Sequence, residues 1–255
     1  MLVTCATFNY LDMLCLLLAS HRATNPEVPL TVHAIGWPTP HLNAAQSLYP
    51  NARFLPQEEF ESDTPLELKG PVPRSADILR MKVRLFNETY QSCDEQLTWV
   101  DADTLLLSPV QPLLERVRLE GDFGVLYRAR SKPHARFNVA IMSFTRSNNA
   151  QQLMSRYAKI TEQTEGTTKR NEVAWFHDQL ALWDAWRELN RGFLGLPIRK
   201  GPKLVPLSSK ELSINGDTDA IFVSRRDKVL DIDAMTKHLT SLDIPISDVH
   251  SAVEN

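Results

Sequence analysis

The sequence predicts an α/β fold with a largely parallel β-sheet. Short apolar segments with strand character alternate with segments of helical periodicity over roughly the first 190 residues, a pattern typical of parallel strands joined by helices. The chain has 255 residues, of which 43% are hydrophobic and 23% charged. This composition is that of a soluble globular protein with one large domain, or one domain with a small C-terminal elaboration.

The chain opens with a strand, a turn and a helix. Residues 2–7 are apolar and form the strand, 8–10 form the turn, and an apolar helix runs from there to about Ala23. The next elements expected are a strand at 29–35, a helix at 41–48 closed by Pro50, a strand at 52–55 and a loop at 58–73.

A longer helix follows Ser75. Its apolar residues recur with helical spacing and face the core: Leu79, Val83, Phe86 and Tyr90. Arg80 and Arg84 share a different, polar stripe of the same helix, which meets either solvent or a ligand.

The remaining elements alternate as before. We expect strands at 96–100, 104–107, 123–127, 138–144 and 220–223, helices around 113–117, 150–163 and 178–189, and a polar connector at 164–171. Prolines and a glycine interrupt the chain after Asn190, and periodicity weakens there.

Two aspartates at the end of a strand are the strongest chemical signal. The run Trp99-Val100-Asp101-Ala102-Asp103-Thr104 places Asp101 and Asp103 two residues apart, so on an extended segment both carboxylates point the same way. Such oxygen ligands suit Mg²⁺ or Mn²⁺, which complete their shells with water and substrate phosphates. The carboxyl edge of an open α/β sheet is also where ligands bind. The alternative is a turn at the strand end without a metal.

The Asp-x-Asp pattern occurs twice more, at Asp217-Thr218-Asp219 and Asp231-Ile232-Asp233. Only the first copy lies between two apolar runs, and the later copies are interpreted as structural.

Several motifs, taken in order, resemble the GT-A glycosyltransferases, most of all the retaining family 8 enzymes. The matching pieces are the opening strand and loop at 3–10, Arg84-Leu85 on the long helix, the Asp101-Ala102-Asp103 strand end, the run Phe137-Asn138-Val139-Ala140-Ile141-Met142, and the helix start His177-Asp178-Gln179-Leu180. The resemblance covers roughly residues 2 to 190 and implies a GT-A fold, with a mixed but mostly parallel, Rossmann-like sheet flanked by helices. It implies a single catalytic domain over 1–255, in which 1–109 form the nucleotide-sugar and metal half, 110–190 the acceptor half, and 191–255 the C-terminal elaboration.

Position by position, the resemblance implies a donor site. Asp101 and Asp103 bind Mn²⁺ or Mg²⁺, with Asp101 also near the ribose, and Ala102 between them belongs to the same donor-binding segment. The remaining donor contacts are Thr7, Asn9 and Tyr10 around the base and ribose, Arg84 or Arg80 at the sugar or phosphates, Asn138 at the sugar, and Asp178 and Gln179 at the reacting centre.

Each implied role has a structural alternative. Arg80 and Arg84 can pair with Asp77 and Glu88 on a solvated helix face. Asn138 can simply begin a strand, Asp178 can cap a helix, and Tyr10 can be a core aromatic residue. Three tryptophans are interpreted as packing residues rather than as a platform for a sugar: Trp175, Trp183 and Trp186.

The resemblance fails near the C-terminus. The family supplies a third metal ligand there from a histidine before glycine, lysine, proline and tryptophan, and no such string exists in this chain. His238 is the candidate for the third ligand, and a surface or packed histidine is its alternative. Retention is the stereochemistry that the resemblance implies.

The expected reaction is transfer of a sugar from a nucleoside diphosphate, UDP by preference, to an acceptor hydroxyl. A glycosyltransferase-like scaffold without turnover is one rival. A sugar-phosphate nucleotidyltransferase is another, but the loop after the first strand lacks the glycines that would cradle a triphosphate.

Charge and cysteine content constrain partners and compartment. The formal net charge is −3, so no general attraction to nucleic acid or anionic membranes follows. Three scattered cysteines favour a reducing cytoplasm, and no apolar run reaches the length of a membrane span.

The identity of the acceptor stays open: its hydroxyl can belong to a glycan, a lipid-linked glycan, a protein or a modified nucleic acid. The oligomeric state stays open as well. The basic stretches at 128–132 and 225–228 are weak indications of an anionic acceptor.

Overall fold

The computed structural model describes residues 1–58, 72–163, 177–191, 201–213 and 220–224, together with 236, 237 and 240; the side chains of 72–77 and 224 are not described. The chain divides into two compact units. The first comprises Met1–Glu59, Thr98–Glu115 and Ser208–Asn255, and the second comprises Phe60–Leu97 and Arg116–Leu207. Helix α4 (Gln111–Glu120) leads from the first unit into the second.

The first unit is built on parallel strands in the order β3-β2-β1-β4. Their bounds are β1 Leu2–Thr7, β2 Leu30–Ile35, β3 Ala52–Gln57 and β4 Leu97–Val100. Every residue of β2 is buried, as expected for a strand covered on both faces of a parallel sheet. Pairing of Val3 with Trp99 sets β1 directly beside β4, so both strands end at the same edge.

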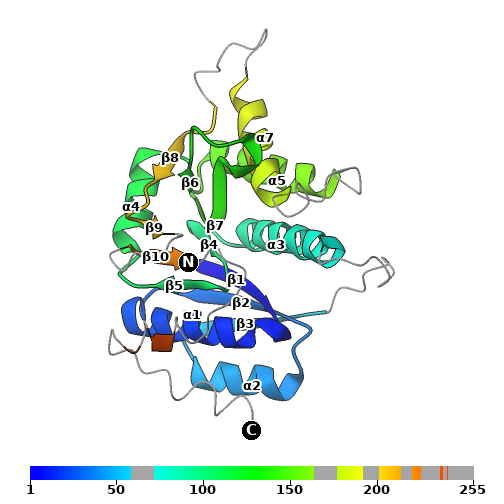
Figure 1. Cartoon of the computed structure of the whole chain (residues 1–255), viewed down its shortest axis with the longest axis vertical. Coiled ribbons are helices and arrows are strands. Elements are labelled where there is room, and N and C mark those ends of the chain that lie inside the picture. Colours follow the sequence, from blue (N-terminus) through cyan, green and yellow to red (C-terminus); the bar gives the residue numbers. More distant parts are fainter. Residues whose placement is uncertain are drawn as a thin grey trace. The chain divides into compact units, whose positions relative to one another are not determined.

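Helices and a small second sheet complete this unit (Figure 1). The short turn η1 (Phe8–Tyr10) leads from β1 into α1 (Leu11–Thr24), whose residues from Met13 to His21 are all buried, and α2 (Thr39–Leu48) packs against β3. The second sheet has the order β5-β10-β9, with β5 at Thr104–Leu106, β9 at Leu212–Ser213 and β10 at Phe222–Ser224.

Asn25, at the end of α1, fixes the chain that follows β5. Its amide Nδ2 donates to the Ser108 carbonyl over 3.1 Å, and its Oδ1 accepts from the Val110 N–H over 2.7 Å. Thr24 Oγ1 also donates to the Leu106 carbonyl, so α1 holds β5 in place.

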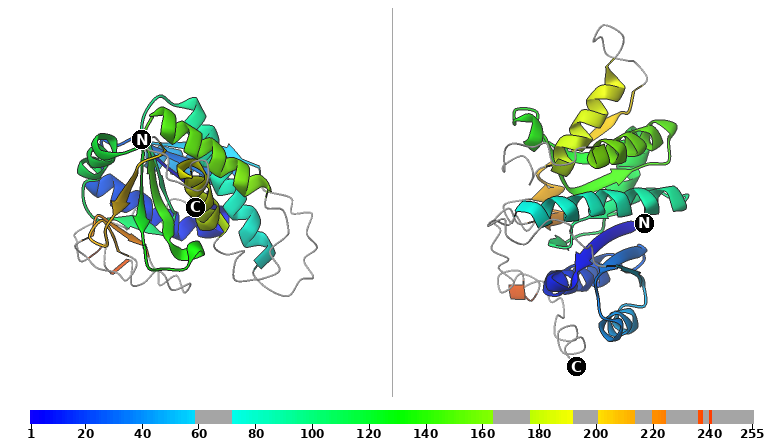
Figure 2. Two further views of the ribbon diagram at one scale, coloured as in Figure 1. Left: turned by 90° about the horizontal axis from the view of Figure 1, so that it is seen from above. Right: turned by 90° about the vertical axis from the view of Figure 1, so that its right-hand side faces the viewer.

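The second unit contains the strands β7-β6-β8 and three helices. The strands are β6 (Phe123–Tyr127), β7 (Phe137–Phe144) and β8 (Leu204–Leu207); β6 runs antiparallel to β7 and parallel to β8. The helices α3 (Val72–Ser92), α5 (Asn148–Gln163) and α7 (His177–Asn190) pack against one another, as Figure 2 shows, and the turn η2 (Pro133–Ala135) lies between β6 and β7.

The structure confirms the expected α/β class and most of the expected elements. It begins α3 at Val72, three residues before Ser75, and adds β8 and β9, which the sequence did not indicate. Short strands such as Leu212–Ser213 carry too few residues for a periodic pattern, so only their pairing partners define them. Within the described residues, none of the helices combines the length and the apolar character that crossing a membrane requires.

Asp122 joins three parts of the second unit. Its carboxylate accepts hydrogen bonds from Ser147 Oγ, from Asn149 Nδ2 over 3.3 Å and from the Lys203 N–H over 2.7 Å. Its carbonyl oxygen accepts from Thr145, so a residue that is 9% exposed ties β6 to the start of α5 and to β8.

Asp122→Ala should lower the free energy of unfolding by about 2–4 kcal/mol, because it leaves several donors without their charged acceptor in a buried place. Equilibrium urea unfolding measures the change. Glu115→Ala is the matched control, since Glu115 is exposed and should change stability by about 0.5 kcal/mol or less. A loss for Asp122→Ala no larger than that of the control would contradict the role given to Asp122.

Candidate functional site

The two aspartates lie on a tight turn between β4 and β5. β4 ends at Val100 and β5 begins at Thr104, and the Thr104 N–H donates to the Asp101 carbonyl over 3.0 Å. The expectation of an extended segment through Asp101 and Asp103 was therefore wrong, because this hydrogen bond folds the backbone back within four residues. Ala102, between them, is buried, whereas both aspartates are half-buried.

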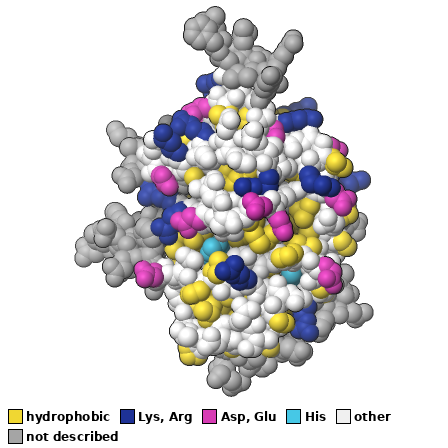
Figure 3. Space-filling view, turned by 180° about the vertical axis from the view of Figure 1, so that it is seen from behind, with side chains coloured by type: hydrophobic (Ala, Val, Ile, Leu, Met, Phe, Trp, Pro, Cys, Tyr) yellow, Lys and Arg dark blue, Asp and Glu magenta, His cyan; other side chains and the backbone are white. Residues whose placement is uncertain are grey.

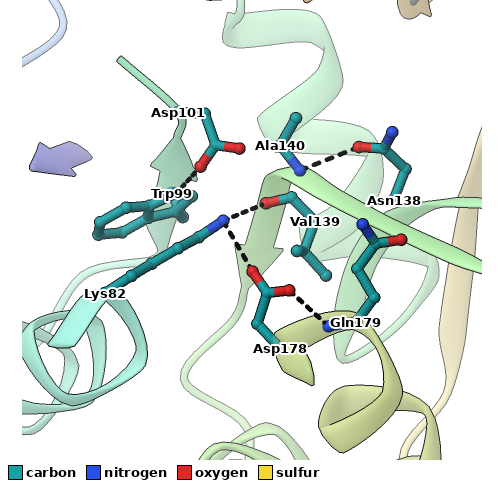
Figure 4. A network of polar contacts seen from close by, with 8 residues as sticks. All are labelled: Lys82, Trp99, Asp101, Asn138, Val139, Ala140, Asp178 and Gln179. Atoms are coloured by element: carbon teal, nitrogen blue, oxygen red, sulfur yellow. Dashed lines mark hydrogen bonds and ion pairs between the residues drawn. The ribbon is translucent and has the colours of Figure 1, made fainter. Parts of the chain in front are cut away.

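A buried tryptophan fixes the first aspartate. Trp99 is 1% exposed, and its indole Nε1 donates to Asp101 Oδ1 over 2.6 Å (Figure 4). A charge-assisted bond of this length is among the stronger hydrogen bonds in proteins. It restricts the orientation of the Asp101 carboxylate at the carboxyl end of β4.

Tyr10 shares this edge with the two aspartates. Burial raises the pKa of Tyr10 above its usual value, and the negative charges of Asp103 and then Asp101 raise it further. The side chain is nevertheless 40% exposed, so it is not the core aromatic of the alternative interpretation. Thr7, half-buried at the end of β1, and exposed Asn9 complete the segment between β1 and α1.

The donor set of this edge fits a hard divalent cation. Two half-buried carboxylates, one of them oriented by Trp99, supply oxygen ligands of the kind that Mg²⁺ and Mn²⁺ take alongside water and phosphate. No group of three or more His, Cys, Asp or Glu that could hold a metal is found in the described part of the chain. His238, the candidate third ligand, lies outside the described residues, as do the two later Asp-x-Asp copies.

A buried ion pair organises the candidate residues of the second unit. The Lys82 ammonium on α3 lies 3.2 Å from Asp178 Oδ2 at the start of α7, and the two side chains are 6% and 3% exposed. Lys82 Nζ also donates to the Val139 carbonyl on β7 over 3.2 Å, so three elements converge on one ammonium group (Figure 4). Asp178 Oδ1 accepts from the Gln179 N–H over 2.8 Å, in the first turn of α7, where a negative charge is favourable.

An irregularity in β7 surrounds Val139, whose carbonyl accepts the hydrogen bond from Lys82. Leu126 pairs with Asn138 but the preceding Val125 pairs with Met142, so residues between these two partners bulge out of the ladder with β6. Asn138 supports the bulge, since its Oδ1 accepts from the Ala140 N–H over 3.0 Å. Asn138 thus does more than begin a strand, and it remains half-buried.

Arg80 and Arg84 of α3 differ in their surroundings. Arg84 is 47% exposed and lies 3.8 Å from Glu88 one turn later, which is the solvated pairing of the structural alternative. Arg80 is half-buried on the same helix.

Sequence reasoning missed Lys82, the cation that contacts Asp178. The signal was available, because Lys82 is spaced three residues after Leu79 and four before Phe86 and so falls on the apolar stripe of the helix. A lysine on that stripe requires a buried anionic partner.

The tryptophans of α7 are packed, as the sequence interpretation held for them. Trp183 lies 5.4 Å from Phe137 and 5.3 Å from Trp186 between ring centroids, and Trp186 Nε1 donates to the Pro202 carbonyl. Trp175 is outside the described residues.

Comparison with known proteins identifies the fold. No family model and no curated protein sequence matches the chain. Solved structures of the galactosyltransferase LgtC do match: its complex with donor and acceptor sugar analogues has a TM-score of 0.55 and 14% identity, over 98% of this chain and 99% of that one. An active-site glutamine-to-glutamate variant of LgtC gives 0.55 at 13% identity, over 94% and 95%. The glycosyltransferase GlyE of Streptococcus pneumoniae TIGR4 gives 0.54 at 8% identity, over 97% of this chain and 65% of that one. The expected GT-A fold, of which LgtC is a family 8 example, is confirmed.

Lys82→Met should lower the free energy of unfolding by about 3–5 kcal/mol, because it leaves the Asp178 carboxylate buried without its cation. Adding Asp178→Asn should recover part of this loss, because the double variant carries no uncompensated charge. Urea unfolding of the single and double variants gives the coupling. Arg84→Met, which breaks the exposed pair with Glu88, serves as the control and should cost about 0.5 kcal/mol or less. Additive effects of the two substitutions would refute the buried pair.

Tyr10 should titrate above its usual range, and Asp103→Asn should bring its pKa down toward, but not to, the ordinary value, since burial remains the larger cause. An ultraviolet difference titration of each protein against its Tyr10→Phe counterpart isolates this phenol. Because the folded-state pKa is raised, the stabilising contribution of neutral Tyr10 is complete below the unfolded-state pKa. It declines as the pH rises through the folded-state value. A Tyr10 titration unchanged by Asp103→Asn would show that the two groups are not neighbours.

Proposed function

We propose that this chain is a metal-dependent glycosyltransferase, which moves a sugar from a nucleoside diphosphate donor, UDP by preference, to an acceptor hydroxyl. One observation carries the proposal: the GT-A fold, shared with LgtC over nearly the whole length of both chains, bears two aspartates at the carboxyl end of β4, beside Tyr10 at the carboxyl end of β1. Ligands of open α/β sheets bind at such an edge.

The proposed diphosphate and nucleoside contacts are residues of the first unit. Asp101 and Asp103 would hold Mn²⁺ or Mg²⁺ together with the donor phosphates, and Thr7, Asn9 and Tyr10 would lie around the base and ribose. The cation, when bound, offsets the negative charge that grows on the departing diphosphate. Trp99 contributes by keeping Asp101 in one orientation before the donor arrives.

The proposed sugar contacts are residues of the second unit. Asn138, Asp178 and Gln179 would contact the donor sugar, and Arg80, which is half-buried on α3, would contact the sugar or a phosphate. Lys82 acts through Asp178: it balances the buried carboxylate and holds it between α3 and β7, so that little reorganisation is needed when sugar binds. One of the similar structures is a variant of LgtC at an active-site glutamine, and a comparable role is proposed here for Gln179 at the start of α7.

The proposed transfer proceeds with retention. The bond between the anomeric carbon and the donor phosphate oxygen breaks, and the acceptor oxygen bonds to that carbon on the same face. The proton of the acceptor hydroxyl passes to the departing phosphate oxygen, so no separate general base is required. Asp178 and Gln179 would stabilise the positive charge that develops on the sugar.

UDP should bind the protein in the presence of Mn²⁺, and Asp103→Ala should weaken this binding by at least about tenfold, equal to about 1.4 kcal/mol, because half of the carboxylate pair is lost. Isothermal titration of UDP and of other nucleoside diphosphates, with and without Mn²⁺, measures both effects. Asp94→Ala is the control, since Asp94 is an exposed aspartate that precedes β4, whereas the turn follows the other end of that strand.

Slow hydrolysis of a UDP-sugar by the wild-type protein tests turnover without a known acceptor. Binding without any hydrolysis or transfer would favour a binding scaffold. If no nucleoside diphosphate binds the folded protein, the glycosyltransferase proposal is wrong.

A further inference from the structure

Positive charge is segregated in one part of the second unit. Between residues 123 and 161 there are seven Lys or Arg and no Asp or Glu, although the whole chain has a formal net charge of −3. Four of the seven lie in the 128–136 loop that joins β6 to β7, and a histidine lies among them: Arg128, Arg130, Lys132, His134 and Arg136.

The 128–136 loop has a defined backbone. The Arg128 N–H donates to the Arg136 carbonyl over 2.7 Å and closes the loop. Within it, the Ser131 N–H donates to Arg128 and the Ala135 N–H to Lys132, while the side chain of Arg136 donates through Nε to the Ser131 carbonyl. The positive groups are therefore attached to a fixed frame rather than to an irregular segment.

Two exposed cations of the loop are suited to binding an anion that is not part of this protein. Arg130 and Lys132 are exposed, and neither forms an ion pair with any side chain among the described residues. Concentrating like charges on a rigid turn is unfavourable by itself, and an anion that binds there removes the repulsion.

Aromatic rings lie against the base of the same loop. The guanidinium carbon of Arg136 is 4.6 Å from the centroid of the Trp183 ring, and Tyr127 stacks on Trp183 with an interplanar angle of 15°. Tyr127 and Trp186, next to Trp183, are each half-buried. The Trp183 Nε1 is buried and meets no hydrogen-bond partner in the part of the chain that the structure describes. Trp183 itself is 5% exposed, so the accessible aromatic surface beside the cations is that of Tyr127 and Trp186. Such a surface suits a saccharide that carries negative charge, because ring faces pack on its apolar C–H face and cations bind its anionic group.

The loop is connected directly to the proposed sugar-binding residues. Arg136 precedes Asn138 by two residues, and Trp183 follows Gln179 by four, about one helical turn along α7. The turn η2 of the loop also packs against α7. Whatever binds the 128–136 loop is thus held by the same strand and helix that carry Asn138 and Gln179.

We propose that the 128–136 loop, with Tyr127, Trp183 and Trp186 beside it, binds the carboxylate or phosphate group of an anionic saccharide that serves as the acceptor. The assignment as acceptor rests on the proposed glycosyltransferase function. A saccharide is favoured over nucleic acid because the charge is local. On the face shown in Figure 3, Lys and Arg side chains are interspersed with Asp and Glu rather than forming one basic surface.

Binding to three dextrans of equal length tests the proposal: unmodified dextran, carboxymethyl dextran and phosphorylated dextran. The wild-type protein should bind a charged dextran at least about tenfold more tightly than the neutral one, with affinity that falls as salt is raised. Preference between the two charged forms distinguishes a carboxylate from a phosphate. Biolayer interferometry with the immobilised polysaccharides gives the dissociation constants.

The double variant R130Q/K132Q should abolish most of the preference for the charged dextrans, whereas R118Q/K210Q should keep it. The second pair removes the same two charges from exposed positions outside the loop. Equal loss in both variants, or equal binding of all three dextrans by the wild type, would overturn the proposal. Tighter binding of a single-stranded oligonucleotide that R130Q/K132Q also abolishes would overturn it in favour of nucleic acid.

Titration of UDP with Mn²⁺ into R130Q/K132Q separates this inference from the function beneath it. Unchanged UDP binding together with lost dextran binding supports both. UDP binding without any preference for charged dextran refutes the acceptor site alone. Failure of the wild type to bind UDP removes the donor site and, with it, the assignment of the saccharide as acceptor.

Discussion

The buried ion pair between Lys82 and Asp178 is the constraint on which the second unit depends. Removing two charges from water is costly, and the cost is recovered only where geometry is good and the remaining hydrogen-bonding capacity is used. Here the ammonium contacts both a carboxylate and the Val139 carbonyl, and the carboxylate also accepts the Gln179 N–H. α3, β7 and α7 must therefore keep their relative positions, and residues that contact sugar in the proposed function gain a rigid frame.

In the first unit, hydrogen bonds fix the positions of the candidate site residues. The turn between β4 and β5 exists because Thr104 donates to Asp101, and the carboxylate of Asp101 is oriented because buried Trp99 donates to it. The negative charges of Asp101 and Asp103 also disfavour ionisation of Tyr10 nearby. A bound cation would offset the same two negative charges, so the two carboxylates are compatible with a metal site.

Charge is distributed unevenly along the chain, and the net charge alone does not reveal this. The formal net charge of −3 indicates no anionic partner, yet the 128–136 loop gathers cations on a hydrogen-bonded frame beside Trp183. If that loop binds an anionic acceptor, the electrostatic attraction is confined to the loop itself. A local arrangement of this kind gives selectivity without general adhesion to nucleic acid or membranes.

Local periodicity and short-range patterns were enough to predict the α/β class, the order of most strands and helices, and the aspartates at the end of β4. Tertiary structure decided the rest. Asp101 and Asp103 lie on a turn because one backbone hydrogen bond overrides the extended geometry that their spacing allows. Lys82, rather than Arg84, meets Asp178 because helix α3 turns position 82 inward and leaves position 84 with Glu88 in solvent. Partners distant in sequence, as Lys82 and Asp178 are, become neighbours only through packing, and no local pattern encodes that choice.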